Sequence, residues 1–183
     1  MRLIVDSGST KTDWICINEK GEVLFDTQTK GLNPQVLTEQ IIEERVINNF
    51  DLYQNRKKIS HLYFYGAGCG TESPRKLIKK VFERIFINSL IDIKEDTYAA
   101  IYATCEPGIK SITSILGTGS NCTYYDGKNI LQKVDSLGYV LMDDASGNYF
   151  GRQLIRDYYF DKMPLSVQTV SYTHLRAHET VGN

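Results

Sequence analysis

The stretch LIVDSGSTKTDWICINEKGEVLF, residues 3–25, contains three short runs of strand-forming residues separated by polar turns. The runs occupy residues 3–5, 14–17 and 23–25, and the turn-like segment 18–21 lies between the second run and the third. Short β-rich runs joined by such turns are typical of hairpins. The chain is therefore expected to open with a three-stranded β-meander.

Beyond this meander, helix and strand patterns alternate. The expected elements are a helix that starts at Asn33-Pro34, a strand at 62–65, a helix that starts at Ser73-Pro74, a strand at 90–93 and a helix at 97–104. In the first helix, Ile42, Val46 and Phe50 recur at the spacing of one helical face, and asparagine before proline is a typical helix start. This order predicts an α/β lobe over residues 1–110.

The same order begins again further along the chain. Strand-like runs at 111–116, 122–125 and 130–131 are separated by glycine turns, and a helix pattern follows at 149–159. We therefore expect the start of a second, similar lobe over residues 111–166, interrupted after one meander and one helix.

The last residues, 167–183, lose the apolar periodicity. Within them, Val170 to Thr180 resembles the sequencing-adapter read-through that is fused to many truncated reading frames. We therefore expect this segment to be a non-native tail, which takes no part in the fold. The alternatives are a metal-binding pair formed by His174 and His178, or a short disordered tail.

The composition is that of an ordinary globular protein. The 183 residues carry 21 Lys and Arg against 22 Asp and Glu, a net charge of −1, and 42% of them are hydrophobic. Near-neutral charge gives no reason to expect nucleic acid or an anionic membrane as a partner. No apolar run is long enough for a membrane span or a signal peptide, which predicts a cytoplasmic protein. The four cysteines match no metal or redox spacing and are expected to be reduced.

A polar turn, DSGSTKTD at residues 6–13, lies between the first two expected strands. Backbone N–H groups of a turn rich in glycine and hydroxyl side chains can hold phosphate. Asp6, at the end of the first strand, is placed to hold a hydrated Mg²⁺ beside that phosphate. A plain polar hairpin is the alternative, because the same residues are common in ordinary turns. The pattern differs from the phosphate loop GxxxxGK[ST], which leads into a helix.

A second turn of the same kind, Gly117 to Asn121, again follows an apolar strand and precedes another. Each turn lies at the first hairpin of its own meander, which predicts two related lobes that hold one nucleotide from opposite sides. The dinucleotide fingerprint GxGxxG does not fit, because Cys122 takes the place of its last glycine.

Together, the two turns resemble the first and second phosphate motifs of the actin-like ATPase superfamily, which contains sugar kinases, Hsp70 and actin. The matching strings are DSGSTKTDW at 6–14 and ILGTGSNC at 115–122. More narrowly, the chain resembles the N-acetylglucosamine kinase group of the BadF/BadG/BcrA/BcrD ATPase family over residues 1 to about 166. The further motifs in order are KGLNP at 30–34, YGAGC at 65–69, Glu95-Asp96 with Ala99-Ala100, and LGY at 137–139 up to Gly151.

The resemblance implies a ribonuclease H-like lobe and an ATP-dependent kinase that phosphorylates a hydroxyl of N-acetylglucosamine or a related amino sugar, with ATP and Mg²⁺ as cofactors. It implies that Asp96 is the catalytic base and that Asp6 holds Mg²⁺ through water. The residues that it places around the ATP phosphates are Gly8, Ser9, Thr10, Lys11, Gly117, Thr118, Gly119, Ser120 and Asn121. Those that it places at the sugar are Asn33, Gly68, Asp96 and Asp143. A homodimer is one expected assembly of the complete protein.

Three of these residues leave a second interpretation open. Asp96 stands where a helix N-cap is expected, and Asn33, which precedes a proline, is the same kind of capping residue. Asp143 lies in the string MDDAS where the family has GDEGS. One carbon less at Asp144 moves its carboxylate by more than a hydrogen bond tolerates, which leaves the particular sugar open.

Two other functions stay open from the sequence. Dehydratase activators of the same family are ATP-driven switches that hold an iron–sulfur cluster through cysteines, and no suitable cysteine pair is present in these residues. The chain, interrupted within its second lobe, could also be an inactive binding fragment that aggregates through an uncovered sheet edge.

Overall fold

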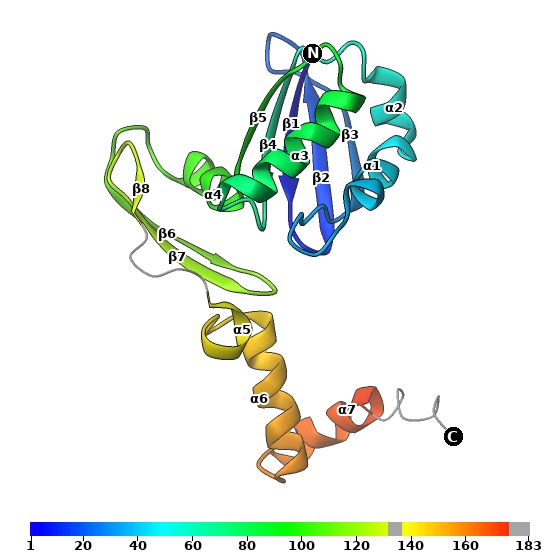
Figure 1. Ribbon diagram of the computed structural model, residues 1–183. Helices are drawn as coiled ribbons and strands as arrows, with labels where there is room; N and C mark the ends of the chain where they lie inside the picture. The colour runs from blue at the N-terminus through cyan, green and yellow to red at the C-terminus, as the bar shows by residue number, and fades with distance from the viewer. Residues whose placement is uncertain (132–136, 176–183) are drawn as a thin grey trace. The chain divides into compact units, whose positions relative to one another are not determined.

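The computed structural model describes residues 1–131 and 137–175 (Figure 1). The chain divides into two compact units, Met1–Ile109 and Lys110–Asn183, and each unit has its own sheet. Within the described ranges, no helix is both long and apolar enough to cross a membrane.

The first unit is built on a five-stranded sheet in the order β3-β2-β1-β4-β5. The strands are β1 (Arg2–Ser7), β2 (Lys11–Ile17), β3 (Val23–Lys30), β4 (His61–Gly66) and β5 (Leu90–Glu95). Strands β1, β2 and β3 are antiparallel neighbours, whereas β1, β4 and β5 run parallel to one another. The predicted opening meander and the two later strands are therefore confirmed.

Helices cover both faces of this sheet. They are α1 (Glu39–Ile47), α2 (Phe50–Asn55), α3 (Glu72–Ile85) and α4 (Asp96–Thr104). Successive side chains of a strand point to opposite faces. In β4, the ring centroid of Phe64 lies 5.2 Å from that of Phe82 in α3, whereas that of Tyr65 lies 6.1 Å from that of Tyr102 in α4. Helices α3 and α4 therefore lie on opposite faces, and α1 packs beside α3 (Figure 1).

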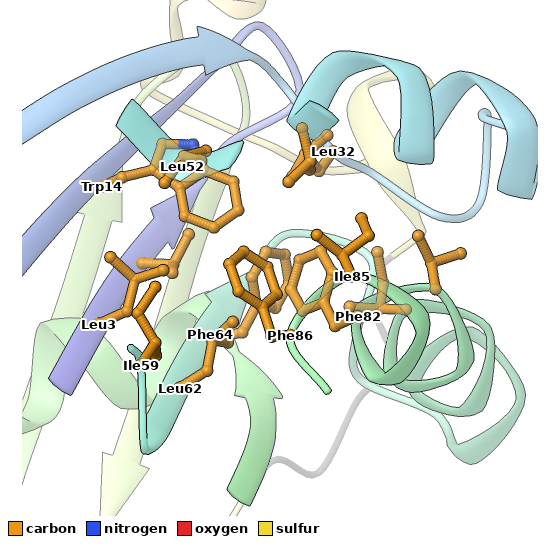
Figure 2. Close-up of a cluster of buried hydrophobic side chains, with 14 of the residues drawn as sticks. Leu3, Trp14, Leu32, Leu52, Ile59, Leu62, Phe64, Phe82, Ile85 and Phe86 are labelled. Carbon is orange, nitrogen blue, oxygen red and sulfur yellow. The ribbon is translucent and has the colours of Figure 1, made fainter. Parts of the chain in front are cut away.

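The core lies between the sheet and helices α1 and α3, and aromatic rings fill its centre (Figure 2). Trp14, Phe82 and Phe86 are fully buried, and the Phe82 ring centroid lies 5.9 Å from that of Trp14 and 5.8 Å from that of Phe86. The Trp14 indole N–H donates to Thr29 Oγ1 at 3.0 Å, so the polar atom of this side chain is satisfied. Burial of each such side chain stabilises the fold by roughly 1.5–3 kcal/mol. This core holds strands β1 and β4 in place.

The first helix differs from its prediction, while the helices expected from Ser73 and at 97–104 are present as α3 and α4. Helix α1 starts at Glu39, after Thr38, whose hydroxyl accepts from the Ile41 N–H at 3.4 Å. The predicted start at Asn33 is therefore wrong, because the Asn33 side chain caps a tight turn instead. The expected continuation to Phe50 is also wrong, since Asn49 caps a separate helix, α2.

The second unit contains a three-stranded antiparallel sheet in the order β6-β7-β8. Its elements are β6 (Ser111–Leu116), β7 (Ser120–Tyr125), β8 (Ile130–Leu131), α5 (Gly138–Leu141), α6 (Gly147–Tyr159) and α7 (Leu165–Leu175). The predicted second meander and the helix at 149–159 are present. Helix α6 buries none of its residues, and Phe150, Leu154 and Ile155 are exposed. The apolar side of α6 is thus uncovered within this unit.

Helix α7 reaches into the segment 167–183 that we expect to be a read-through tail. A helical conformation does not test where a sequence came from, so this expectation stays a prediction. His178 and the side chain of His174 lie outside the described residues. The alternative of a metal-binding histidine pair therefore lies outside the described residues too.

Candidate active site

Three parallel strands of the first unit end at the same edge of their sheet. In the pairing register, Ser7 of β1 lies beside Gly66 of β4, and Gly66 lies beside Glu95 of β5. The first phosphate turn, the loop 67–70 and helix α4 all begin at this edge. Ligands of open α/β sheets bind at the carboxyl ends of the parallel strands. We call this edge the candidate active site of the first unit.

The first predicted phosphate turn joins β1 to β2. Its backbone closes with a hydrogen bond from the Gly8 N–H to the Lys11 carbonyl at 3.0 Å. On either side of the turn, the buried hydroxyls of Ser7 and Thr12 lie 2.8 Å apart and share a hydrogen bond. Sequence reasoning missed this pair, although a hydroxyl residue on each side of the turn was its signal. The pair ties the end of β1 to the start of β2.

Charged side chains flank this turn. Lys11 Nζ lies 3.0 Å from Asp13 Oδ2, so the predicted phosphate ligand Lys11 is held in an exposed ion pair. Asp6 pairs with Asp13 in the strand register. Partial burial raises the pKa of Asp6, although the residue still reaches solvent, and the charge of Asp13 raises it further while Lys11 lowers it. A cation would relieve this crowding of negative charge.

The position of the Asp6 carboxylate suits a hydrated Mg²⁺. Mg²⁺ prefers oxygen ligands, keeps several waters and takes only one or two carboxylates from the protein. An exposed carboxylate at the end of β1 meets that requirement. No cluster of three or more His, Cys, Asp or Glu residues converges as a metal cage in the part of the chain that the structure describes.

Asp96 is the first residue of α4, directly after β5. The N-cap position belongs to Glu95, so the expectation that Asp96 is the cap is corrected by one residue. The Asp96 Oδ1 accepts from the Thr97 N–H at 3.0 Å. Burial raises the pKa of Asp96 to about 6, and the charges of Glu95 and Asp6 add to this effect, while hydrogen bonds from backbone N–H groups oppose it. The charge of Asp6 is thus felt at Asp96, in the same candidate active site.

Asn33 and Gly68 come together at the same edge. The Asn33 Oδ1 accepts from the Gln35 N–H at 2.9 Å, and its Nδ2 donates to Ser9 Oγ at 3.2 Å. Gly68 has a φ of +80°, and a Cβ there would lie 2.3 Å from Asn33 Oδ1. Only glycine fits a left-handed backbone at this distance. The structure therefore brings Ser9, Asn33 and Gly68 into contact, although they are far apart in the sequence.

Cys69, next to Gly68, lies in the same loop and is buried. Burial raises the pKa of the Cys69 thiol to about 12, and the charge of Asp96 adds to that effect. A thiol with such a pKa is a poor nucleophile, which favours a packing role for Cys69 in this loop.

In the second unit, the predicted turn Gly117 to Asn121 lies against the start of α6. The Gly147 N–H donates to the Gly117 carbonyl at 2.9 Å, and the Asn148 N–H donates to the Thr118 carbonyl at 3.2 Å. Sequence reasoning missed this support. The buried N-cap Ser146, which accepts from the Tyr149 N–H at 3.1 Å, was the available signal.

Asp143 also lies at this second turn. A Cβ on Gly119 would lie 2.8 Å from Asp143 Oδ2, and the Ser120 hydroxyl donates to the Asp144 carbonyl at 2.8 Å. Asp143 and Ala145 have φ values of 67° and 61°, in the left-handed region. The structure therefore groups the predicted residues in two sets, one in each unit, with Asp143 in the set of the second turn.

Comparisons with solved structures show strong similarity over most of this chain. A candidate N-acetylglucosamine kinase from Porphyromonas gingivalis matches with 34% identity and a TM-score of 0.84, covering 96% of this chain and 62% of its own. A second candidate N-acetylglucosamine kinase, from Chromobacterium violaceum, matches with 18% identity and a TM-score of 0.62, covering 86% of this chain and 56% of its own. The chain thus spans less than two thirds of either protein.

A more distant similarity points to the same fold. The inorganic polyphosphate/ATP-glucomannokinase of Arthrobacter sp. strain KM matches with 16% identity and a TM-score of 0.50, covering 84% of this chain and 72% of its own. No protein-family profile matches the chain, and no curated protein is significantly similar to it. The fold is that of the actin-like ATPases, with a ribonuclease H-like lobe, and the predicted fold class is confirmed.

Proposed function

We propose that this chain belongs to an ATP-dependent kinase that phosphorylates a hydroxyl of N-acetylglucosamine or a related amino sugar. The observation that carries the proposal is Asp96, a partly buried carboxyl at the parallel-strand edge whose pKa is raised to about 6. Such a group is ionised at neutral pH, yet it accepts a proton more readily than an ordinary aspartate. Phosphoryl transfer to a hydroxyl needs a base of this kind.

In the proposed reaction, the oxygen of a sugar hydroxyl attacks the γ-phosphorus of ATP in line with the leaving oxygen of ADP. The new O–P bond forms, the bond from the γ-phosphorus to the bridging oxygen breaks, and the hydroxyl proton passes to the Asp96 carboxylate. The protein contributes position and charge more than covalent chemistry.

Each unit carries one turn that we propose for phosphate. In the first unit, the turn from Gly8 to Lys11 would hold phosphate through its backbone N–H groups, and Asp6 would hold Mg²⁺ through the waters of the ion. When bound with the nucleotide, Mg²⁺ neutralises charge on the phosphates. In the second unit, Gly117 to Asn121 is the corresponding turn, and α6 supports it through the Gly147 N–H.

In the first unit, the residues that we propose for the sugar are Asn33, Gly68 and Asp96, and Asp143 of the second unit is a further proposed ligand. Asn33 offers both donors and acceptors to sugar hydroxyls, and the absence of a side chain at Gly68 lets Asn33 take this position. The similarity to the candidate N-acetylglucosamine kinase of P. gingivalis supports an amino sugar as the acceptor. It also supports membership of the BadF/BadG/BcrA/BcrD group within the actin-like ATPases.

The test is sugar-dependent ADP release by the protein expressed from its full natural reading frame, which sequencing of the source DNA across the codons for Pro164 to Val170 defines. N-acetylglucosamine, glucosamine and glucose are compared as acceptors, and we expect the first to give the highest kcat/KM. Asp96→Asn should lower kcat by about 10²- to 10⁴-fold. Asp92→Asn, in the preceding strand β5 and exposed, is the matched control and should leave kcat unchanged.

The pH dependence gives a second readout. Only the ionised Asp96 carboxylate can accept a proton, so kcat/KM should fall as the pH is lowered through about 6. Normal turnover by Asp96→Asn would contradict the assignment of the base. ADP release that does not respond to any sugar would contradict the kinase itself.

Two other functions make different predictions. An ATPase activator of the dehydratase type would carry iron and a brown chromophore, and would hydrolyse ATP without sugar. Cys16 and Cys69 are buried and Cys122 is exposed, and the described cysteines form no group that could hold a cluster. An inactive binding fragment would bind ATP or sugar without turnover. Helix α6, with its uncovered apolar side, would favour aggregation of such a fragment.

A further inference from the structure

The Asn33 side chain has one defined orientation. The Gln35 N–H, 2.9 Å from Asn33 Oδ1, can only donate. The oxygen of the carboxamide must therefore face Gln35, which directs the nitrogen toward Ser9. The Asn33 Nδ2 then donates to Ser9 Oγ at 3.2 Å. Two hydrogen bonds from different segments thus fix the rotation of this carboxamide.

After these two bonds, Asn33 still has free capacity. A carboxamide has two N–H donors and two oxygen lone pairs, so one donor and one acceptor are left for a ligand. A side chain at Gly68 would displace Asn33 Oδ1, since even a Cβ would lie 2.3 Å from it. The glycine thus allows the Asn33 carboxamide to pack directly against the loop 67–70.

Ser9 is itself held against the loop that carries Asn33. The Gly31 N–H donates to the Thr10 carbonyl at 2.9 Å, and a Cβ on Gly31 would lie 2.3 Å from the Ser9 carbonyl oxygen. The Arg45 guanidinium donates to the Gly31 carbonyl. The predicted phosphate turn and the loop that carries Asn33 are therefore hydrogen-bonded to each other.

We propose that Ser9 is a positioning residue, which holds the Asn33 carboxamide in its sugar-binding orientation and so couples the phosphate turn to the sugar. This inference rests on the proposed kinase function and adds to it a role for one hydroxyl. A group that is already oriented before the ligand arrives loses less entropy on binding. Because one hydrogen bond links the two ligand contacts, occupation of either one should favour the other.

The test measures the binding of N-acetylglucosamine by calorimetry in the absence of nucleotide, on the protein from its full reading frame. Ser9→Ala should weaken sugar binding about twofold to tenfold, the loss expected for one hydrogen bond. Ser9→Thr keeps the hydroxyl and should restore most of the affinity. Ser60→Ala is the matched control, because it removes a serine hydroxyl that donates to the Met1 carbonyl, just before β4 and away from the strand end at Gly66. It should bind sugar as the wild type does.

A double-mutant cycle separates positioning from a general loss of structure. In the Asn33→Ala background, Ser9→Ala should have no further effect on sugar affinity, because the side chain it positions is gone. Unchanged sugar affinity in Ser9→Ala would mean that Ser9 serves only the phosphates and would overturn the inference alone. An equal loss in both backgrounds would also overturn it. A wild-type protein that binds no sugar would overturn the proposed function and this inference together.

Discussion

Asp96→Asn should stabilise the first unit at neutral pH, in spite of removing the proposed base. The raised pKa means that the folded protein binds the Asp96 proton more tightly than the unfolded chain does. The free energy of unfolding therefore falls as the pH rises from 3.8 through about 6. At ~1.4 kcal/mol for each tenfold change in proton affinity, the ionised carboxylate costs up to ~3 kcal/mol at neutral pH. Asparagine carries no charge, and its Oδ1 can still accept from the Thr97 N–H.

The assay is urea unfolding of the wild type and of Asp96→Asn, followed by circular dichroism at about pH 4 and about pH 7.5. We expect the variant to be more stable by ~1–3 kcal/mol at the higher pH and nearly equal to the wild type at the lower one. Asp92→Asn is the control, because its exposed ion pair with Lys94, at 3.7 Å, should contribute less than ~1 kcal/mol. A variant less stable than the wild type at the higher pH would refute the reasoning. So would a difference that does not change with pH.

The left-handed positions make two further predictions. Gly68→Ala should destabilise the protein by ~1–2 kcal/mol through backbone strain and should also weaken sugar binding, because the new Cβ meets Asn33 Oδ1. Gly21 has a φ of +84°, and a Cβ there would have no neighbouring atom within 4 Å, so Gly21→Ala should show the strain without the loss of sugar affinity. Equal sugar binding by the two variants would contradict the contact between the Gly68→Ala side chain and Asn33. Ala145→Gly, at φ 61°, should stabilise the second unit by about 1 kcal/mol or less, as measured by thermal unfolding. The control is Ala103→Gly, within helix α4, which should destabilise the protein by about 1 kcal/mol. A loss of stability in both alanine-to-glycine variants would count against backbone strain at Ala145.

The strands could be predicted because each has its own local signal. The meander and β5 follow from short apolar runs between turn residues, a pattern that lies within a few positions of the chain. The first helix could not be placed, because Asn33, Thr38 and Asn49 are all acceptable capping residues. The structure caps helices at Thr38 and Asn49, while Asn33 faces the phosphate turn. All three residues carry similar local capping signals, and the contact of Asn33 with Ser9 in the phosphate turn determines that Asn33 does not start a helix.

The candidate site was predictable in residue type but not in its connections. The glycine and hydroxyl turns and the carboxylate at Asp96 could be recognised in the sequence. The bond between Ser9 and Asn33 joins residues 24 positions apart, and the raised pKa of Asp96 depends on burial and on Asp6 in another strand. Such effects require the sheet register, which no local pattern contains. The second turn's support by Gly147 was hidden for the same reason.

The position of β1 in the middle of the sheet has a consequence for synthesis on the ribosome. Arg2 of β1 pairs with Ile17 on one side and with His61 on the other. At ~5–20 residues per second, the second edge of β1 stays open for several seconds after the hairpin with β2 can form. An open strand edge is a site of wrong pairing, so a newborn chain should need protection during this interval. The turn that we propose for phosphate is thus made well before Asp96, the proposed base.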